Sequence, residues 1–276
     1  MTYATVMVCL GLDKPNDARL EVAGELAERF EAAIVGIAAA QFVPPVYFAD
    51  GAFAQGVIDQ EEAAIRKRLA ELEDEFRSAT SHRSRNVQWR GAMDFPARFI
   101  LQEARCADII VSGGQSPAFS DAFALASPKD LVMQAGRPLL VAPDGASWLD
   151  LRSVLIAWKE TAEARRAVAD SLPLLRRAKE VTVAEILEDG RDRPAAVTRV
   201  NDVVAWLSRH GVSAAERVSE NGGGDTAAQL DDIAGAVGAG LIVAGAYGHS
   251  RFRELVLGGM TEHLLTQTTR CVLLSH

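Results

Sequence analysis

The sequence contains little cysteine, no surplus of positive charge and no long apolar run, and each shortage narrows the class of protein. Cysteine accounts for 3 of the 276 residues, and no two cysteines have the Cys-x-x-Cys spacing of a redox or zinc motif. Cys9, Cys106 and Cys271 each lie inside or beside an apolar stretch. We therefore expect small, buried cysteine side chains in a protein of a reducing compartment.

Positive charge is scarce, because 29 lysines and arginines stand against 37 aspartates and glutamates, a formal net charge of -8. Nucleic acids and anionic membranes both bind clustered cations, so we expect neither as a partner. The apolar opening, residues 1–12, has no cationic leader and meets charge at Asp13, which favours a strand over a signal peptide. No apolar run reaches membrane-spanning length, and we expect a cytoplasmic protein.

The sequence does contain one internal repeat. Residues 5–12, TVMVCLGL, and residues 153–158, SVLIAW, are apolar, largely β-branched runs that each lead into an apolar pattern of helical period. Residues 107–116, ADIIVSGGQS, match residues 239–248, AGLIVAGAYG. A repeat of this length predicts two tandem domains of the same type.

We place the domains at residues 1–145 and 151–276, and the boundary falls in DGASWLDLR, residues 144–152. Residues 41–56, QFVPPVYFADGAFAQG, have no counterpart in the second domain. Their proline, glycine and aromatic content predicts either a surface excursion or lid, or a flap packed between the domains.

Strand-like and helix-like segments alternate in both domains, which specifies a parallel sheet with helices on both faces. The strands are continuous apolar runs, as burial on two faces requires. In the second domain we predict strands at 153–158, 180–187, 212–217, 240–245 and 271–275, and helices at 161–177, 193–210, 225–238 and 258–268. The predicted fold class is α/β, with two tandem doubly wound five-stranded parallel-sheet domains.

The second domain has glycines where its sheet can bind a ligand. Gly245 ends the predicted fourth strand, beyond which ligands of open parallel sheets bind, and Gly248 follows. Gly258 and Gly259 precede a helical run whose free N–H groups can bind an anion, and Thr261 adds a hydroxyl. The alternative is steric, because glycines are also common at strand ends and helix starts.

Other motifs give no site. Residues 221–225, NGGGD, follow the predicted third strand, so Asp225 is expected to cap the next helix rather than belong to a phosphate loop. The five histidines are scattered without metal-ligand spacing, so we assign no metal site. No acid, base or nucleophile set stands out, and we assign no catalytic residue.

Residues 245–261, GAYGHSRFRELVLGGMT, closely resemble the G-x2-G-x9-G-[ST] signature of the universal stress protein family. Gly245, Gly248 and Gly258 fall on its three glycines, and the resemblance covers the whole chain as two tandem domains. It implies a stress-response protein that binds ATP or AMP, with or without Mg²⁺, as a cofactor. The implied phosphate site is the glycine loop, and the implied adenine site lies near the first and second strands.

The resemblance assigns the nucleotide to the second domain. The implied binding residues are Ala157, Trp158, Lys159, Ile186, Gly245, Gly248, His249, Ser250, Gly258, Gly259, Met260 and Thr261. For Trp158 the alternative is core or interface packing, and for Lys159 it is an exposed strand-end position. The resemblance also implies that the domains pair through their last strands, near 138–141 and 271–274, and a homodimer stays open.

The sequence departs from the family pattern at several positions. Gly259 stands where the family has serine or threonine, and one lost hydrogen bond should cost about 0.5–1.5 kcal/mol. In the first domain Gly113 is kept, but Ser116 and Ala126 replace the other two glycines and Asp121 adds negative charge. We therefore expect the C-terminal half to hold the nucleotide.

The expected function is sensory or regulatory, with at most slow ATP hydrolysis. An alternative is a tandem scaffold without nucleotide that acts through protein–protein contacts, which Gly259 and Lys159 favour. A nucleotidyl-transferring enzyme of a related fold is a third reading, and the missing acid, base and metal set argues against it.

Overall fold

The computed structural model describes residues 2–12, 15–43, 51–115, 123–187, 192–221, 224–247, 259–267 and 269–276. The strands of the N-terminal half are β1 (Thr5–Cys9), β2 (Ala33–Ala39), β3 (Val87–Ala92), β4 (Ile109–Gly113) and β5 (Leu139–Ala142). Its helices are α1 (Asp17–Phe30), α2 (Gly51–Thr80), α3 (Pro96–Glu103) and α4 (Pro128–Gln134), with the 3-10 turn η1 (Ala104–Cys106) after α3.

The C-terminal half repeats this alternation. Its strands are β6 (Ser153–Ala157), β7 (Glu180–Leu187), β8 (Ala215–Glu220), β9 (Leu241–Gly245) and β10 (Cys271–Ser275). Its helices are α5 (Ala162–Leu175), α6 (Arg193–Arg209), α7 (Thr226–Ala236) and α8 (Gly259–Thr266). Most bounds lie within two residues of the prediction. β8 begins later than predicted, because Gly211 (φ 79°) and the Val212 N–H bond to Leu207 O (3.0 Å) keep the chain in the turn after α6.

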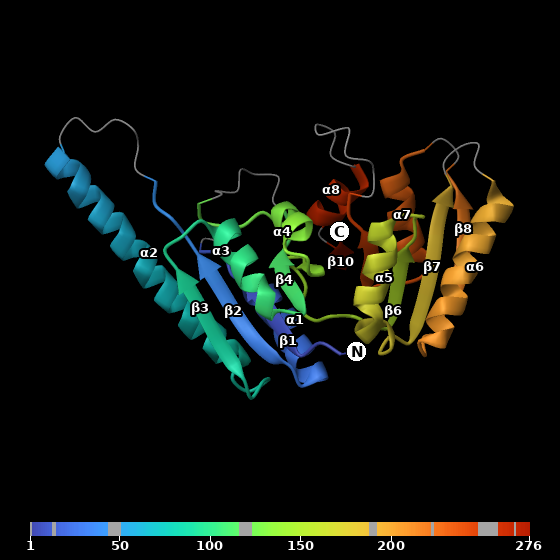
Figure 1. The fold of residues 1–276 in the computed structure, drawn as a ribbon, viewed down its shortest axis with the longest axis horizontal. Coiled ribbons are helices and arrows are strands. Elements are labelled where there is room, and N and C mark those ends of the chain that lie inside the picture. Colours follow the sequence, from blue (N-terminus) through green and yellow to red (C-terminus); the bar gives the residue numbers. More distant parts are fainter. Residues whose placement is uncertain are drawn as a thin grey trace.

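The strands form one sheet in the order β3-β2-β1-β4-β5-β10-β9-β6-β7-β8 (Figure 1). Neighbouring strands within a half are parallel, whereas β5 and β10 pair antiparallel, with Val141 opposite Val272 and Leu139 opposite Leu274. The predicted α/β class, with doubly wound parallel sheets, is confirmed. The resemblance implied that residues 138–141 and 271–274 lie close together, and the two sheets join there through β5 and β10.

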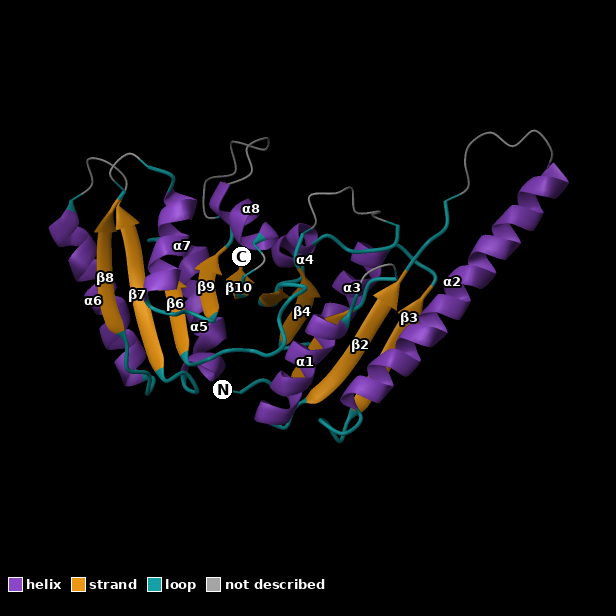
Figure 2. Ribbon diagram, turned by 180° about the vertical axis from the view of Figure 1, so that it is seen from behind, coloured by secondary structure: helices purple, strands orange, loops and turns teal. Residues whose placement is uncertain are grey.

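Helices cover both faces of this sheet (Figure 2). On one face α1, α2, α5 and α6 enclose a buried apolar cluster that includes Leu26, Phe76 and Val200. On the other face α3, α4, α7 and α8 enclose a second cluster, which includes Ile100 and Leu264. The central strands are buried on both sides, which is why their sequences are continuous apolar runs.

Side-chain caps start the helices of the C-terminal half. Thr161 accepts a hydrogen bond from Ala164 N–H, and Asp192 does the same for Ala195. Asp225 accepts from Ala227 N–H (3.0 Å), so its predicted role as the cap after NGGGD is confirmed.

α2 spans 30 residues. Residues 51–56, which the sequence analysis grouped with the excursion, lid or flap at 41–56, are its first turns, and residues 44–50 lie outside the described residues. The C-terminal part of the helix packs on β2, where a Cβ added to Gly36 would lie 2.7 Å from the Phe76 ring. The N-terminal part extends past the sheet (Figure 1).

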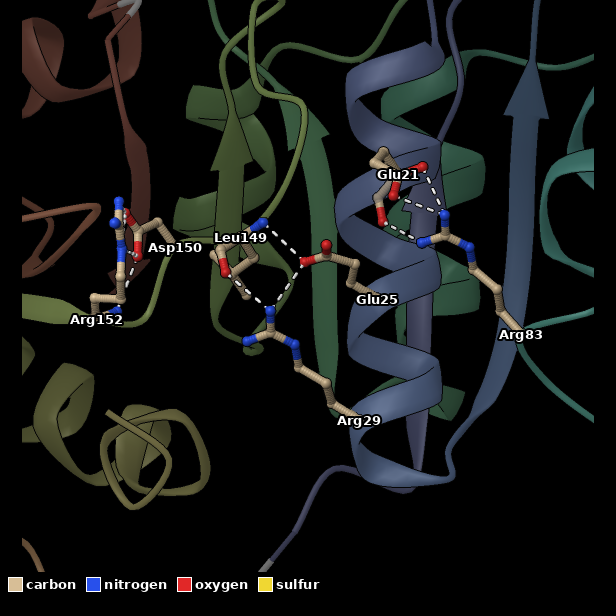
Figure 3. Close-up of polar contacts among 7 residues, drawn as sticks. All are labelled: Glu21, Glu25, Arg29, Arg83, Leu149, Asp150 and Arg152. Carbon is tan, nitrogen blue, oxygen red and sulfur yellow. Dashed lines mark hydrogen bonds and ion pairs between the residues drawn. The ribbon is translucent and has the colours of Figure 1, made fainter. Parts of the chain in front are cut away.

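The segment between the halves is fixed to α1. Glu25 Oε2 accepts from the Leu149 N–H (2.8 Å) and Arg29 Nη2 donates to the Leu149 carbonyl (3.2 Å) (Figure 3). The Leu149 side chain is fully buried. On the other side, a Cβ on Gly240 would lie 2.4 Å from Asp150 Cβ, so this glycine lets the segment pack closely on the C-terminal half. The joint is therefore an ordered packing element.

The cysteines differ in accessibility. Burial raises the pKa of the Cys9 thiol and of the Cys271 thiol to about 12, so both stay protonated at neutral pH. Cys106 is only half-buried, and the expectation of burial is wrong for it. At pH 8 we expect a thiol reagent to label Cys106 in the native protein and to label the other two only after unfolding, because the thiolate is the reactive form. Mass spectrometry of native and urea-unfolded samples measures this; native labelling of Cys9 would contradict it.

No helix among the described residues is long and apolar enough to cross a membrane.

Candidate functional site

The candidate site lies where the strand order of the C-terminal half reverses, between β6 and β9. Ala157 at the end of β6 pairs with Ala244 of β9 on one side and with Ala184 of β7 on the other. The predicted residues Ala157, Ile186 and Gly245 therefore lie near the carboxyl ends of three adjacent strands. Ile186 is half-buried on the face of α7 and α8.

Gly245 is needed for packing against the protein's own helix. A Cβ at this position would lie 2.4 Å from Ala164 N and 2.6 Å from Glu163 C, both backbone atoms of the first turn of α5. The space that glycine leaves is thus filled by α5. The close approach that we expected for a ligand is made here by the chain itself.

The two helix starts near the crevice differ in what they offer an anion. At α5, Thr161 Oγ1 already accepts from Ala164 N–H (3.2 Å), which satisfies one of the first-turn donors. At α8, Gly259 is exposed, and a Cβ there would meet no atom of the described residues within 4 Å. Among the described residues, the start of α8 is thus the more open helix N-terminus beside the crevice.

Thr261 joins this helix to the strand end. It is 5% exposed, and its Oγ1 accepts from the Tyr247 N–H (3.3 Å). Its oxygen therefore fixes the chain just after β9 relative to the first turn of α8. Met260, also predicted, is half-buried against the α7–α8 side of the core.

Tyr247 is a residue that sequence reasoning missed. It has φ 59°, in the left-handed region that non-glycine residues rarely adopt. Its hydroxyl is buried and has no hydrogen-bond partner in the described part of the chain, and burial, with Glu262 and Asp130 nearby, raises its pKa to about 12. Backbone strain of this kind occurs often at ligand sites. A tyrosine within a glycine signature gives no sequence signal of positive φ.

Trp158 is 7% exposed and belongs to the core under α5 and α6, so the core-packing alternative describes its position. Its N–H donates to Ala184 O of β7 (2.8 Å), and the next residue of β7, Glu185, is 5% exposed and accepts from Arg199 of α6 (2.5 Å). Trp158 Nε1 and Glu185 Oε2 are both buried without a partner among the described residues. The sequence analysis missed this buried ion pair, because an isolated glutamate in a strand resembles a surface residue.

The structure says less about the other predicted site residues. Lys159 is half-buried two residues after β6, and its carbonyl accepts from Thr161 N–H (2.8 Å). Gly248, His249, Ser250 and Gly258 lie outside the described residues.

In the N-terminal half, the corresponding crevice is filled by Arg19 of α1. Arg19 is 3% exposed and donates to Cys9 O (3.3 Å) and to Asn16 Oδ1 (3.2 Å). A Cβ on Gly113 would lie 2.5 Å from its Nε. Burial lowers the pKa of the guanidinium. The two halves therefore fill the same position differently, with helix backbone beside Gly245 and with an arginine side chain beside Gly113.

The strand-end segment of the N-terminal half also contacts α8. Gln115 N–H donates to Leu265 O (2.8 Å), and its Nε2 donates to Glu262 Oε1 (3.3 Å). The helix that begins beside the candidate site in one half is thus hydrogen-bonded to the other half.

The topology defines a doubly wound α/β protein with two halves of the same strand order. No model of a known protein family matches the sequence, and no curated protein matches it. Among solved structures, a universal stress protein from Archaeoglobus fulgidus DSM 4304 is similar, with TM-score 0.66, 14% identity and coverage of 99% of this chain and 98% of that one. The fold of this chain is that of the universal stress proteins.

Two further structures are similar over the same length. A protein of unknown function from Pseudomonas aeruginosa PAO1 has TM-score 0.58 and 15% identity, and covers 99% of this chain and 92% of its own. A protein from Pseudomonas aeruginosa UCBPP-PA14, provisionally assigned as a universal stress protein, has TM-score 0.59 and 13% identity, with coverage of 99% and 93%. These likenesses extend across both halves.

Proposed function

We propose that the protein is a stress-response protein that binds an adenine nucleotide, ATP or AMP, in its C-terminal half. The observation that carries the proposal is the start of α8 near the β6–β9 strand ends, where a Cβ added to Gly259 would meet no described atom within 4 Å. The fold, and the glycine signature that leads into α8, support the same site.

In this proposal the phosphates lie over the first turn of α8 and the adenine lies over the ends of β6 and β7. Backbone N–H groups at the helix start hold the phosphate oxygens, aided by the helix dipole. Met260 and Ile186 provide half-buried apolar surface near the strand ends. Lys159, two residues after β6, supplies positive charge for the phosphates, with or without bound Mg²⁺.

The regulatory role rests on the contacts of α8. Thr261 connects the helix to Tyr247 on the ligand side, and Leu265 and Glu262 bond Gln115 of the N-terminal half. A nucleotide that shifts the first turn of α8 therefore changes a contact between the halves. This is binding coupled to conformation, and it needs no catalytic group.

The test is to identify any nucleotide that copurifies, by native mass spectrometry, and then to titrate the protein with ATP and AMP by calorimetry. We expect saturable binding that Gly248→Val abolishes, because a side chain there blocks the glycine loop of the signature. Ser116→Val, at the matching position of the N-terminal half, should leave binding unchanged. Equal effects of the two substitutions would refute the assignment to the C-terminal half.

A scaffold without nucleotide is the second candidate. Arg19 fills one crevice, and α5 fills the space beside Gly245 in the other. A protein that purifies without nucleotide and shows no heat of ATP binding would support the scaffold. Hydrolysis well above background, lost on one side-chain substitution, would instead indicate an enzyme.

A further inference from the structure

A groove runs along the outer edge of the sheet in the N-terminal half, far along the sheet from the candidate nucleotide site. β3 is the end strand of the sheet as described, so one of its two edges pairs with no described strand (Figure 1). The groove encloses about 670 Å³. Its floor is the strand from Trp89 to Met93, one wall is α2 with Leu69 and Ala70, and the other is α3 with Phe99.

The floor offers free backbone groups. The carbonyls of Asn86 and Ala92 accept from Ile34 N–H (2.9 Å) and Ala40 N–H (3.2 Å) of β2, so the even-numbered residues point inward. Backbone direction alternates along a strand, so Trp89 and Gly91 direct their N–H and C=O groups into the groove. Such a row of donors and acceptors matches another extended chain and little else.

Both walls are apolar near the floor. The indole of Trp89 lies on the α2 side with Leu69, and Phe99 lies on the α3 side near Ala92. A strand laid beside β3 would point successive side chains to opposite faces, so each would meet one apolar wall. Charges at the rim are balanced, because Arg66 pairs with Glu62, Glu73 with Arg77 and Arg90 with Glu103. The groove therefore fits a segment of low net charge that places some apolar side chains against Trp89, Leu69 and Phe99.

The strand at the opposite end of the sheet carries more charged side chains than β3. The other end strand, β8, has the sequence AERVSE, with three charged side chains in six residues. Charged side chains on an end strand discourage pairing with further strands. β3, with the sequence VQWRGA, carries one charge, and that arginine is held by Glu103. The edge at β8 is thus better protected against pairing with a further strand than the edge at β3.

We propose that this groove binds an extended peptide segment of another protein, which joins the sheet as a strand beside β3. The five floor residues at about 3.3 Å each give roughly 16 Å, enough for about five residues of extended chain. A second copy of this chain is the wrong shape, since its own β3 lies between the same two walls and two concave edges cannot meet. A single strand can enter where a folded edge cannot.

The test uses a displayed library of random twelve-residue peptides, selected against the full-length protein, and one selected peptide made by synthesis. We expect Ala70→Glu, an exposed wall position, to weaken binding of that peptide at least about tenfold by placing a charge in the apolar groove. Ala64→Glu is the matched control, because Ala64 is also exposed on α2 but does not line the groove. It should change affinity less than about twofold.

Hydrogen exchange gives the second readout. Peptide addition should protect the amides of Trp89 and Gly91, which point into the groove, and should leave that of Arg90 unchanged because it faces β2. Equal binding by the Ala70→Glu and Ala64→Glu variants, or protection elsewhere, would overturn the proposal. Selection of no peptide would overturn it too, as would a concentration-dependent dimer that Ala70→Glu dissociates. Titration of the same two variants with nucleotide tests the nucleotide proposal independently, so that the failure of one proposal can be told from the failure of the other.

Discussion

Gly245→Ala is expected to lower the free energy of unfolding by about 3 kcal/mol, at the upper end of the cost of overpacking a core. The added Cβ would lie 2.4 Å from Ala164 N and 2.6 Å from Glu163 C. These are backbone atoms of a helix start, so no flexible side chain can move aside. Either α5 or β9 must shift, and both belong to the buried core. Urea unfolding followed by circular dichroism measures the change in midpoint.

Gly259→Ala is the matched control in the same glycine signature. A Cβ at Gly259 meets nothing within 4 Å, and alanine in a helix is favoured over glycine. This variant should keep or slightly raise the unfolding midpoint. If Gly245→Ala left stability unchanged while removing nucleotide binding, the packing role of Gly245 would be refuted and a ligand role favoured.

Leu149→Ala is expected to cost about 3 kcal/mol, although it lies in the segment between the halves. Its side chain is fully buried in the cluster shared by α1, α5 and their neighbours. Its N–H and carbonyl are bonded to Glu25 and Arg29 of α1, so the backbone cannot easily collapse into the cavity (Figure 3). Differential scanning calorimetry should show a lower unfolding temperature.

Trp148→Ala provides the comparison at the adjacent residue. Trp148 is 41% exposed, and its ring lies 5.1 Å from the Arg152 guanidinium. Loss of an exposed contact of this kind should cost less than about 1 kcal/mol. If Trp148→Ala lowered the unfolding temperature more than Leu149→Ala, the exposed contact of Trp148 and not the buried side chain of Leu149 would be what fixes the segment.

Much of the fold follows from local pattern. The apolar runs at 109–113 and 241–245 form buried central strands, since only a strand covered on both faces needs to be apolar throughout. Asp225 caps α7 as predicted, because an aspartate before a helical run satisfies a free N–H wherever it occurs. Local signals were less specific at residues 51–56, where proline, glycine and aromatic content predicted an excursion, lid or flap but did not show that these residues are the first turns of α2.

Less of the candidate site than of the fold could be predicted from the sequence. Glycine spacing identified the strand end and the start of α8, but it did not show that α5 would fill the space beside Gly245. Arg19 gave no signal in the sequence, because a charged residue in the first turn of a helix is normally exposed. Its burial depends on Gly113, which lies on a distant strand. The positive φ of Tyr247 is likewise set by contacts and not by residue type.

The sequence by itself determined the class of the protein: a repeated βα pattern with continuous apolar strands, since periodicity and burial are properties of neighbouring residues. Only the tertiary structure decided that β5 and β10 pair antiparallel with Val141 opposite Val272, that each strand-end glycine faces the protein's own atoms, and that β3 keeps an open edge between two walls. These features depend on distances between residues far apart in the chain, which no local pattern encodes.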